Sequence, residues 1–204
     1  IQGIIKNALR EDIGTGDHST LACIPSSARG KAALLVKESG YISGLDFAHQ
    51  VFKTLSPDIV FEALQNDGAF SEKGAIVFTV EGPSHILLQA ERLVLNAMQR
   101  MSGITTKTRA YVAQLEGTKT KLLDTRKTTP GIRALEKWAV RLGGGVNHRF
   151  ALYDAIMLKD NHIDFCGGLV QALNKTKTYL DSLSVAIPVI VETRNLCSRA
   201  HQGK

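Results

Sequence analysis

The chain has 204 residues, of which 44% are hydrophobic and 22% are charged, and its formal net charge is +6. This composition is ordinary for a globular protein, and no apolar run approaches the ~20 residues that a membrane-spanning helix needs. The three cysteines, Cys23, Cys166 and Cys197, are too scattered for a disulfide framework, so we expect buried, unreactive thiols in a cytoplasmic protein that does not bind membranes.

The first part of the chain, to about residue 80, alternates predicted helices with short strands. Residues 1–9 have the pattern of an amphipathic helix, and residues 45–55 place apolar side chains on one helical face. Residues 31–37 and 75–80 are short apolar runs with glycines nearby, which is typical of strands.

A long helix is predicted next, with its start at Pro83 and Ser84. Its apolar residues follow the helical spacing i, i+3, i+4, i+7, i+8 and i+11, and they are Ala90, Leu93, Val94, Ala97, Met98 and Met101. We expect Gly103 to end this helix, and a second helix to follow over residues 106–116 up to Gly117.

From residue 121 onward, short strands alternate with helices. A helix is predicted from Pro130, with Thr129 as its cap and the glycine run 143–145 at its end, and another over residues 169–183. The predicted strands are residues 121–124, 155–158 and 187–191. This alternation indicates parallel βαβ units and an α/β fold. A complete parallel barrel has about eight strands, so we expect the sequence to cover only part of the protein.

Polar and charged side chains follow each of these strands and the glycine run. They are Thr125, Arg126, Lys127, His148, Arg149, Lys159 and Glu192. Because active sites of parallel barrels lie at the C-terminal ends of the strands, we expect these side chains to converge on one cleft.

Several permanent cations in one partly enclosed cleft repel one another unless an anion lies among them. Arginine binds carboxylates and phosphates through two parallel hydrogen bonds, and lysine acts as a point charge. The expected ligand is therefore small and carries at least two negative groups. Glu192 is a candidate ligand for Mg²⁺, which commonly bridges a protein carboxylate and phosphate oxygens. The alternative is an ion pair of Glu192 with Arg194 or another neighbour.

Each of these positions has a simpler explanation when it is considered alone. A basic residue after a strand is usually a solvated loop residue, and a glycine run is more often a turn than a phosphate-binding loop. His162 is expected to be structural, whereas for His148 the structural and functional readings stay open.

Five stretches of the sequence resemble the quinolinate phosphoribosyltransferase family, which catalyses a decarboxylating step of NAD biosynthesis. They lie in order along the chain, at residues 11–20, 91–104, 124–140, 143–149 and 159–163. The most specific of these motifs are DTRKTTPG, GGGVNHR and KDNH. The resemblance covers nearly the whole chain.

The resemblance implies two domains. Residues 1–104 are expected to form an N-terminal α/β sandwich domain with a dimer-forming helix. Residues 105–204 are expected to form part of an incomplete, seven-stranded α/β barrel without its C-terminal strands. The implied activity is transfer of phosphoribose from PRPP to quinolinate with Mg²⁺, which yields nicotinate mononucleotide, pyrophosphate and CO₂.

The resemblance also implies roles for individual residues. Lys127, Lys159 and Glu192 are the expected catalytic residues, and Glu192 is the expected Mg²⁺ ligand. Arg92 is expected on the polar face of its helix, from which it reaches the site of a neighbouring subunit in a homodimer or larger homo-oligomer. The full set of expected substrate-binding residues is Arg92, Thr125, Arg126, Lys127, His148, Arg149 and Lys159.

Three other functions compete with this interpretation. The first is that the protein is a paralogue of the same fold that acts on another substrate, such as nicotinate, or that is linked to molybdenum transport. A nucleic-acid-binding protein needs an exposed basic face with aromatic platforms, which an aromatic content of 6% disfavours, so no nucleic-acid partner is expected. A Schiff-base barrel enzyme would use Lys159 as its nucleophile and needs that amine desolvated.

Overall fold

The computed structural model describes residues 1–192, and the chain forms two compact units, Ile1–His148 and a second unit that begins at Arg149. Within the described residues, no helix is long and apolar enough to cross a membrane. The domain boundary expected between residues 104 and 105 stays a prediction.

The first unit is built on a three-stranded antiparallel sheet with the order β1-β5-β3. The central strand β5 (Ile76–Pro83) pairs with β1 (Arg29–Leu35) on one side and with β3 (Val60–Ala63) on the other. Two further strands, β2 (Gly40–Tyr41) and β4 (Phe70–Ser71), form a separate antiparallel pair. The strands predicted at residues 31–37 and 75–80 are therefore confirmed, with small shifts of their ends.

Three helices precede or interrupt this sheet in the sequence. The predicted helices at residues 1–9 and 45–55 are confirmed as α1 (Gln2–Ile13) and α3 (Leu45–Leu55). The short α2 (His18–Cys23) was not predicted, and the Asp17 carboxylate caps it by accepting a hydrogen bond from the Thr20 amide at 3.1 Å.

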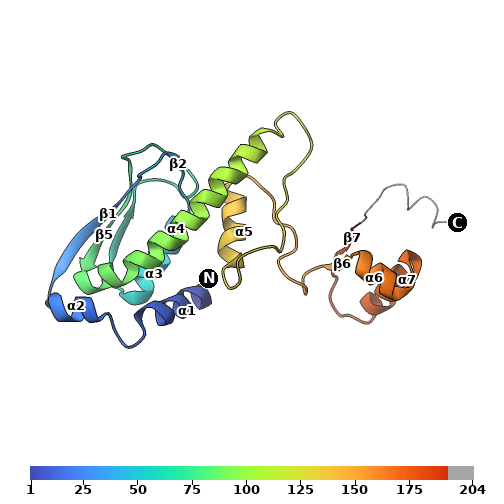
Figure 1. The fold of residues 1–204 in the computed structure, drawn as a ribbon, viewed down its shortest axis with the longest axis horizontal. Helices are drawn as coiled ribbons and strands as arrows, with labels where there is room; N and C mark the ends of the chain where they lie inside the picture. The colour runs from blue at the N-terminus through green and yellow to red at the C-terminus, as the bar shows by residue number, and fades with distance from the viewer. Residues whose placement is uncertain (193–204) are drawn as a thin grey trace. The chain divides into compact units, whose positions relative to one another are not determined.

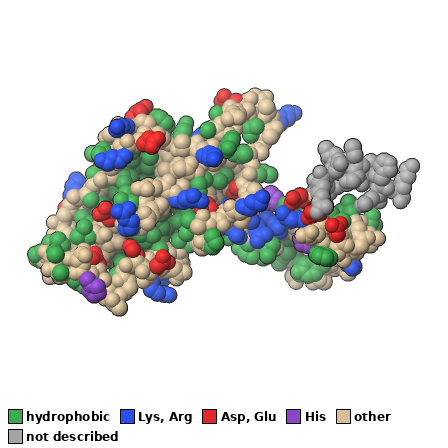
Figure 2. All heavy atoms as spheres, in the orientation of Figure 1, with side chains coloured by type: hydrophobic (Ala, Val, Ile, Leu, Met, Phe, Trp, Pro, Cys, Tyr) green, Lys and Arg blue, Asp and Glu red, His purple; other side chains and the backbone are tan. Residues whose placement is uncertain are grey.

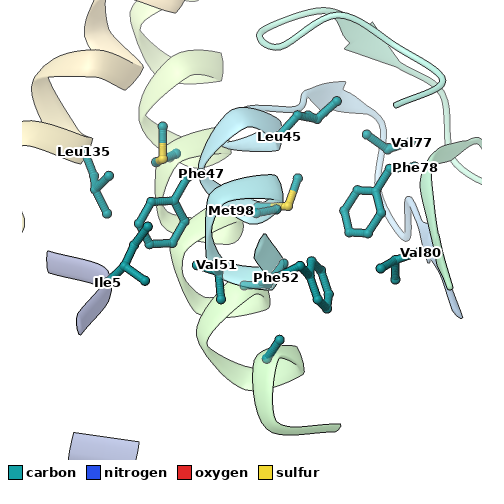
Figure 3. Close-up of a cluster of buried hydrophobic side chains, with 14 of the residues drawn as sticks. Ile5, Leu45, Phe47, Val51, Phe52, Val77, Phe78, Val80, Met98 and Leu135 are labelled. Atoms are coloured by element: carbon teal, nitrogen blue, oxygen red, sulfur yellow. The ribbon is translucent and has the colours of Figure 1, made fainter. Parts of the chain in front are cut away.

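The hydrophobic core of the first unit lies between the sheet and the helices. Phe47 and Val51 of α3 and Val77 of β5 are completely buried. Figure 3 shows Ile5, Phe47 and Leu135, which come from three different helices, gathered on one side of this core. Burying each such side chain stabilises the fold by about 1.5–3 kcal/mol, so α1 and α3 are held by packing rather than by helix propensity.

The long helix α4 (Ser84–Ala113) continues through Gly103, and the prediction that this glycine ends the helix is wrong. A glycine inside a helix costs about 1 kcal/mol, and tertiary contacts beyond it offset that cost. Thr105 is fully buried, and its hydroxyl donates to the Ala139 carbonyl at 2.9 Å and accepts from the Ser43 hydroxyl at 2.8 Å. The separate helix expected at residues 106–116 is therefore the last part of α4.

Helix α5 (Arg133–Leu142) packs against α4 (Figure 1). It begins at Arg133 with Ile132 as its N-cap, so the predictions of a start at Pro130 and of Thr129 as the cap are wrong. The Thr129 amide instead donates to the Glu136 carboxylate at 3.0 Å. The helix ends at Gly143, as predicted. A Cβ atom at Gly143 would lie 2.5 Å from the Thr108 Cβ, so the glycine run allows α5 to approach α4 and is not free to cradle a phosphate at this position.

The strand predicted at residues 121–124 is reduced to one parallel bridge between Leu123 and Val146. The Val146 amide donates to the Leu122 carbonyl at 2.8 Å, and the Asp124 amide donates to the Val146 carbonyl at 3.1 Å. The segment is thus extended and paired, but it is too short to count as a strand.

The second unit contains a parallel βαβ arrangement. Strand β6 (Ile156–Leu158) pairs with β7 (Val189–Val191), and α6 (Asp160–Cys166) and α7 (Leu169–Asp181) lie between them in the sequence. The parallel strands and the helix predicted at 169–183 are confirmed, whereas α6 was not predicted. The α/β fold class with an N-terminal sheet domain is also confirmed.

The expectation of buried thiols is wrong for Cys23, which is exposed, and Cys166 is only partly buried. Cys197 lies outside the described residues.

Candidate active site

The predicted site residues are divided between the two units. The first unit carries Arg92, Thr125, Arg126, Lys127 and His148, and the second carries Arg149, Lys159 and Glu192. Their convergence on one cleft stays a prediction.

In the first unit, Arg126 and Lys127 belong to residues 124–129, which we call the cationic loop. Thr125 and Lys127 are exposed, and Arg126 is half-buried. The Lys127 amide donates to the Thr125 hydroxyl at 3.1 Å, so the chain turns tightly at this point. The turn directs alternate residues of the loop into different environments.

Arg126 has an unusual environment for a basic side chain. Within residues 1–192, its Nε and that of Arg149 are the two buried side-chain polar atoms that have no hydrogen-bond partner. A buried donor without an acceptor costs about 1–3 kcal/mol. Arg149 is anchored nevertheless, because its Nη1 donates to the Ala155 carbonyl at 3.0 Å. Both guanidinium groups therefore carry a donor that no group within residues 1–192 satisfies.

His148 is held by its backbone. Its amide donates to Asp124 Oδ1 at 2.8 Å, and its carbonyl accepts from Lys137 Nζ at 3.0 Å. The Asn147 side-chain amide donates to Asp124 Oδ2 at 2.8 Å and to the Lys137 carbonyl at 2.9 Å. These contacts fix the segment that carries His148 relative to the cationic loop. They involve only the backbone of His148 and none of the atoms of its imidazole ring.

Sequence reasoning missed three charged residues at this site. Asp124 and Lys137 form an ion pair of 2.5 Å, and their side chains are 7% and 2% exposed. Glu136 pairs with Arg100 of α4 at 2.7 Å. In the sequence, Glu136 and Lys137 look like the solvated charges of any amphipathic helix, so no local signal marks them as buried.

Glu136 is ionised at neutral pH in spite of its burial. Burial acts to raise the pKa of this carboxyl group, but hydrogen bonds from the Thr129 hydroxyl and amide, together with the Arg100 charge, hold the pKa below its ordinary value. The carboxylate is therefore a stable acceptor for the loop at neutral pH.

In the second unit, the strand register brings Lys159 and Glu192 together. Leu158 lies opposite Val191, and the Glu192 amide donates to the Leu158 carbonyl at 2.9 Å. Each charged residue is the first after its strand, so the two side chains emerge at the same edge, and Lys159 Nζ lies 2.9 Å from Glu192 Oε2. The alternative partner Arg194 lies outside the described residues.

The described residues contain no preformed metal-binding cluster. Within residues 1–192, no three His, Cys, Asp or Glu side chains come close enough together to hold one. Glu192 offers one carboxylate, and its side chain is 52% exposed. A single accessible carboxylate fits Mg²⁺ held mainly by substrate phosphates and water, but it does not fit an ion caged by protein alone.

Lys159 does not have the surroundings of a Schiff-base nucleophile. Its side chain is 43% exposed and is paired with Glu192, whereas such a lysine needs a desolvated amine. Its amide donates to His162 Nδ1 at 3.1 Å at the start of α6, so His162 has the structural role that was predicted.

Arg92 is exposed on α4, as predicted from the apolar spacing of this helix. Whether it reaches a neighbouring subunit stays a prediction. On the face that Figure 2 shows, basic and acidic side chains are interspersed over the N-terminal part of the chain. This distribution does not favour the alternative of a nucleic-acid-binding face.

Two family descriptions match the chain. Residues 17–102 match the N-terminal domain of quinolinate phosphoribosyl transferase, and residues 104–201 match its C-terminal domain.

Individual relatives agree with this match. The chain is 43% identical over 197 residues to the chloroplastic nicotinate-nucleotide pyrophosphorylase [carboxylating] of rice, and 44% identical over 197 residues to quinolinate phosphoribosyltransferase [decarboxylating] 1b of tobacco. Both alignments cover 96% of the chain, but only 53% of the rice protein and 56% of the tobacco protein. The chain thus spans about half the length of these relatives.

Solved structures are also similar. The crystal structure of NadC from Streptococcus pyogenes has a TM-score of 0.88 and 40% identity, and the alignment covers 97% of this chain and 69% of that one. The nicotinate-nucleotide pyrophosphorylase from Francisella tularensis has a TM-score of 0.85 and 37% identity, with the same coverage.

Proposed function

The chain belongs to the quinolinate phosphoribosyl transferase family, and from this premise we propose that the full-length protein transfers phosphoribose from PRPP to quinolinate. The products are nicotinate mononucleotide, pyrophosphate and CO₂, and the reaction is a step of de novo NAD biosynthesis.

The observation that carries the proposal is the buried, unpartnered Nε of Arg126. It belongs to a loop whose neighbouring carboxylates, Asp124 and Glu136, are already paired with Lys137 and Arg100. The guanidinium therefore has no need to serve as a structural counter-ion and is available to an anionic substrate. This supports a substrate with carboxylate or phosphate groups.

The proposed task of the basic residues is to bind two polyanions that repel each other in solution. Arg126 and Arg149 have the planar geometry that matches carboxylates and phosphates, and Lys127 and Lys159 supply point charges. Thr125 and His148 are proposed to contribute further polar contacts. Holding both substrates in the reacting geometry lowers the entropic part of the barrier by several kcal/mol.

Bond formation follows from this positioning. The bond between C1 of the ribose and the pyrophosphate oxygen breaks, and the pyridine nitrogen forms the new bond to C1. Lys127 and Lys159 are proposed to stabilise the negative charge that develops on the departing pyrophosphate. When Mg²⁺ is bound with PRPP, it neutralises part of the diphosphate charge, and Glu192 is the proposed protein ligand.

Decarboxylation is proposed to follow the transfer. The alkylated ring nitrogen is positively charged and draws the electron pair that remains at C2 when the adjacent carboxylate leaves as CO₂. A proton from solvent then completes C2. No strongly acidic or basic side chain is needed for this step.

The test is an assay of the full-length protein with quinolinate, PRPP and Mg²⁺ that follows nicotinate mononucleotide and CO₂ together. We expect both products in equal amounts, and a loss of kcat/KM of about 100-fold or more in Arg126→Ala. Lys121→Ala, which removes an exposed lysine just before the loop, should retain full activity. A folded wild-type protein that turns over nicotinate but not quinolinate would identify the paralogue instead.

A homodimer with a shared site is part of the proposal, because Arg92 lies exposed on α4. Mixing the inactive variants Arg92→Ala and Arg126→Ala should restore roughly a quarter of the wild-type activity. About half of the randomly formed dimers contain one copy of each variant, and each such dimer has one intact site out of two. No recovery on mixing, from variants that are dimeric, would contradict the shared site. We also propose a cytoplasmic location. Plant relatives have chloroplastic and mitochondrial names, so cell fractionation should test whether this protein is found in the cytoplasm or in an organelle.

A further inference from the structure

Two adjacent residues of α5, Glu136 and Lys137, have no role in the chemistry described above, yet both are almost completely buried. Glu136 is 6% exposed and Lys137 is 2% exposed. Charged side chains are almost never buried unless they are paired. Replacing a buried ion pair by apolar residues is often neutral or stabilising, so stability alone does not explain two such residues side by side.

Lys137 holds the start of the cationic loop. Its Nζ donates to Asp124 Oδ1 at 2.5 Å and to the His148 carbonyl at 3.0 Å. The same Asp124 oxygen accepts from the His148 amide at 2.8 Å. The first residue of the loop and the backbone of His148 are therefore joined through one buried ammonium group.

Glu136 holds the end of the same loop. Its Oε2 accepts from the Thr129 amide at 3.0 Å, and its Oε1 accepts from the Thr129 hydroxyl at 2.8 Å. Arg100 of α4 completes this cluster, since its Nε donates to Glu136 Oε1 at 2.8 Å and its Nη2 donates to Thr129 Oγ1 at 3.2 Å. The last residue of the loop is thus fixed to two helices.

Adjacent residues of a helix point in directions about 100° apart, so Glu136 and Lys137 reach different ends of one loop from a single turn of α5. Both carboxylates at the loop ends, Asp124 and Glu136, are neutralised by cations that lie outside the loop. The cation between them, Arg126, is consequently neither displaced toward these carboxylates nor neutralised by them.

We propose that Glu136 and Lys137 are positioning residues that clamp both ends of the cationic loop and hold Arg126 and Lys127 in place for anionic substrates. The inference rests on the proposed function for the identity of those substrates. The clamp itself is a property of the described residues and acts in the absence of ligand. It predicts that loosening one end exposes the loop without unfolding the unit.

The experiment uses the full-length variant Glu136→Gln, which keeps the shape of the side chain and removes its charge. Trypsin cleaves after Arg126 and Lys127 within the loop and after Arg92 within α4, and mass spectrometry measures each rate. We expect loop cleavage to rise about tenfold or more, with cleavage after Arg92 changed less than about twofold. We also expect kcat/KM for quinolinate to fall about tenfold to 100-fold, with the circular dichroism spectrum unchanged.

Thr129→Val is the second variant, because it removes the hydroxyl contacts but retains the amide that donates to Glu136. It should shift loop cleavage and kcat/KM in the same direction, by smaller factors. Glu72→Gln is the matched control, since Glu72 also accepts a hydroxyl hydrogen bond, from Ser39 at 2.8 Å, outside the loop. This control should change neither readout.

Equal acceleration of cleavage after Arg92 and after Arg126 would overturn the clamp, because it would indicate general destabilisation. An unchanged loop in folded Glu136→Gln would also overturn it. If the wild-type protein fails to turn over quinolinate, the proposed function is wrong. The comparison of cleavage rates after Arg92 and Arg126 still tests whether Glu136 holds the loop.

Discussion

Residues 1–192 contain two lysine–carboxylate pairs at or beside predicted site residues, one in each unit, and their burial differs sharply. The side chains of Lys137 and Asp124 are 2% and 7% exposed, whereas those of Lys159 and Glu192 are 43% and 52% exposed. Breaking a buried pair leaves an uncompensated charge and costs several kcal/mol. An exposed pair contributes about 0–1 kcal/mol.

This difference separates a structural role from a proposed ligand-binding role. The buried pair is expensive to break and therefore fixes the geometry of the cationic loop. The exposed pair is easily broken, which is compatible with the proposed roles of Lys159 in phosphate binding and of Glu192 in Mg²⁺ binding. Each pair joins a lysine to a carboxylate, and the two differ mainly in how far their surroundings exclude water.

The largest effect is expected for Lys137→Met. The substitution leaves Asp124 buried without its counter-ion and should lower the free energy of unfolding by about 3–5 kcal/mol, measured by urea denaturation. Lys53→Met is the control, because Lys53 Nζ donates to the Ile59 carbonyl at 2.8 Å but has an exposed side chain, and its effect should be much smaller. Equal losses of unfolding free energy in the two variants would contradict the expectation that a buried lysine contributes more to stability than an exposed one.

A smaller effect is expected for Gly143→Ala, which tests the packing that positions α5 and hence the clamp. The new Cβ would lie 2.5 Å from the Thr108 Cβ and 2.9 Å from the Thr105 carbonyl oxygen, at a cost of about 1–3 kcal/mol. Gly103→Ala is the control, because nothing lies within 4 Å of its Cβ, and it should stabilise the helix by about 0.5–1 kcal/mol. Thermal denaturation should therefore give opposite shifts of Tm.

The acid dependence of stability sharpens the comparison further. Because the folded-state pKa of Glu136 is lowered from 4.5, its stabilising effect is fully present above this ordinary value and is lost as the pH falls through the folded-state pKa. The stability difference between wild type and Glu136→Gln should therefore shrink below about pH 4. It is measured by urea denaturation at a series of pH values.

Asp67 provides the control of opposite sign. Burial raises its pKa above 3.8 and outweighs hydrogen bonds from the backbone amides at the start of α3. Wild type should thus gain stability relative to Asp67→Asn as the pH falls. Parallel curves for the two variants would contradict both assignments.

The smallest change in stability is expected for Glu192→Gln in the exposed pair, about 0.5 kcal/mol or less. Activity should nevertheless fall, and more Mg²⁺ should be needed for half-maximal rate, because the proposed metal ligand loses its charge. Stability and activity are measured on the same preparation. A loss of stability as large as that of Lys137→Met would show that the exposed pair is also structural.

Local sequence patterns predicted the elements whose apolar residues have a regular period. The helix at residues 45–55 has the predicted ends, and β1 and β5 appear within a few residues of their predictions. The end of α4 was misplaced because the contacts of Thr105 with Ser43 and Ala139 involve residues far away in the sequence. Local propensity contains no information on such contacts.

The candidate site shows the same limit. Residues that follow strands were recognised, and the structure brings Lys159 and Glu192 together as parallel pairing requires. Asp124, Glu136 and Lys137 were missed because their importance depends on burial. A charged helical residue looks the same in the sequence whether it contacts water or a loop 13 residues away.

The sequence by itself determined the family, the α/β class and the order of the basic motifs, because these depend on residue identity, spacing and hydrophobic period. Only the tertiary structure decided which charges are buried and which contact solvent. The physical reason is that the energy of a charge depends on its desolvation and its partners. For Lys137 these are set by Asp124 and the His148 carbonyl, which the tertiary structure brings within hydrogen-bond distance.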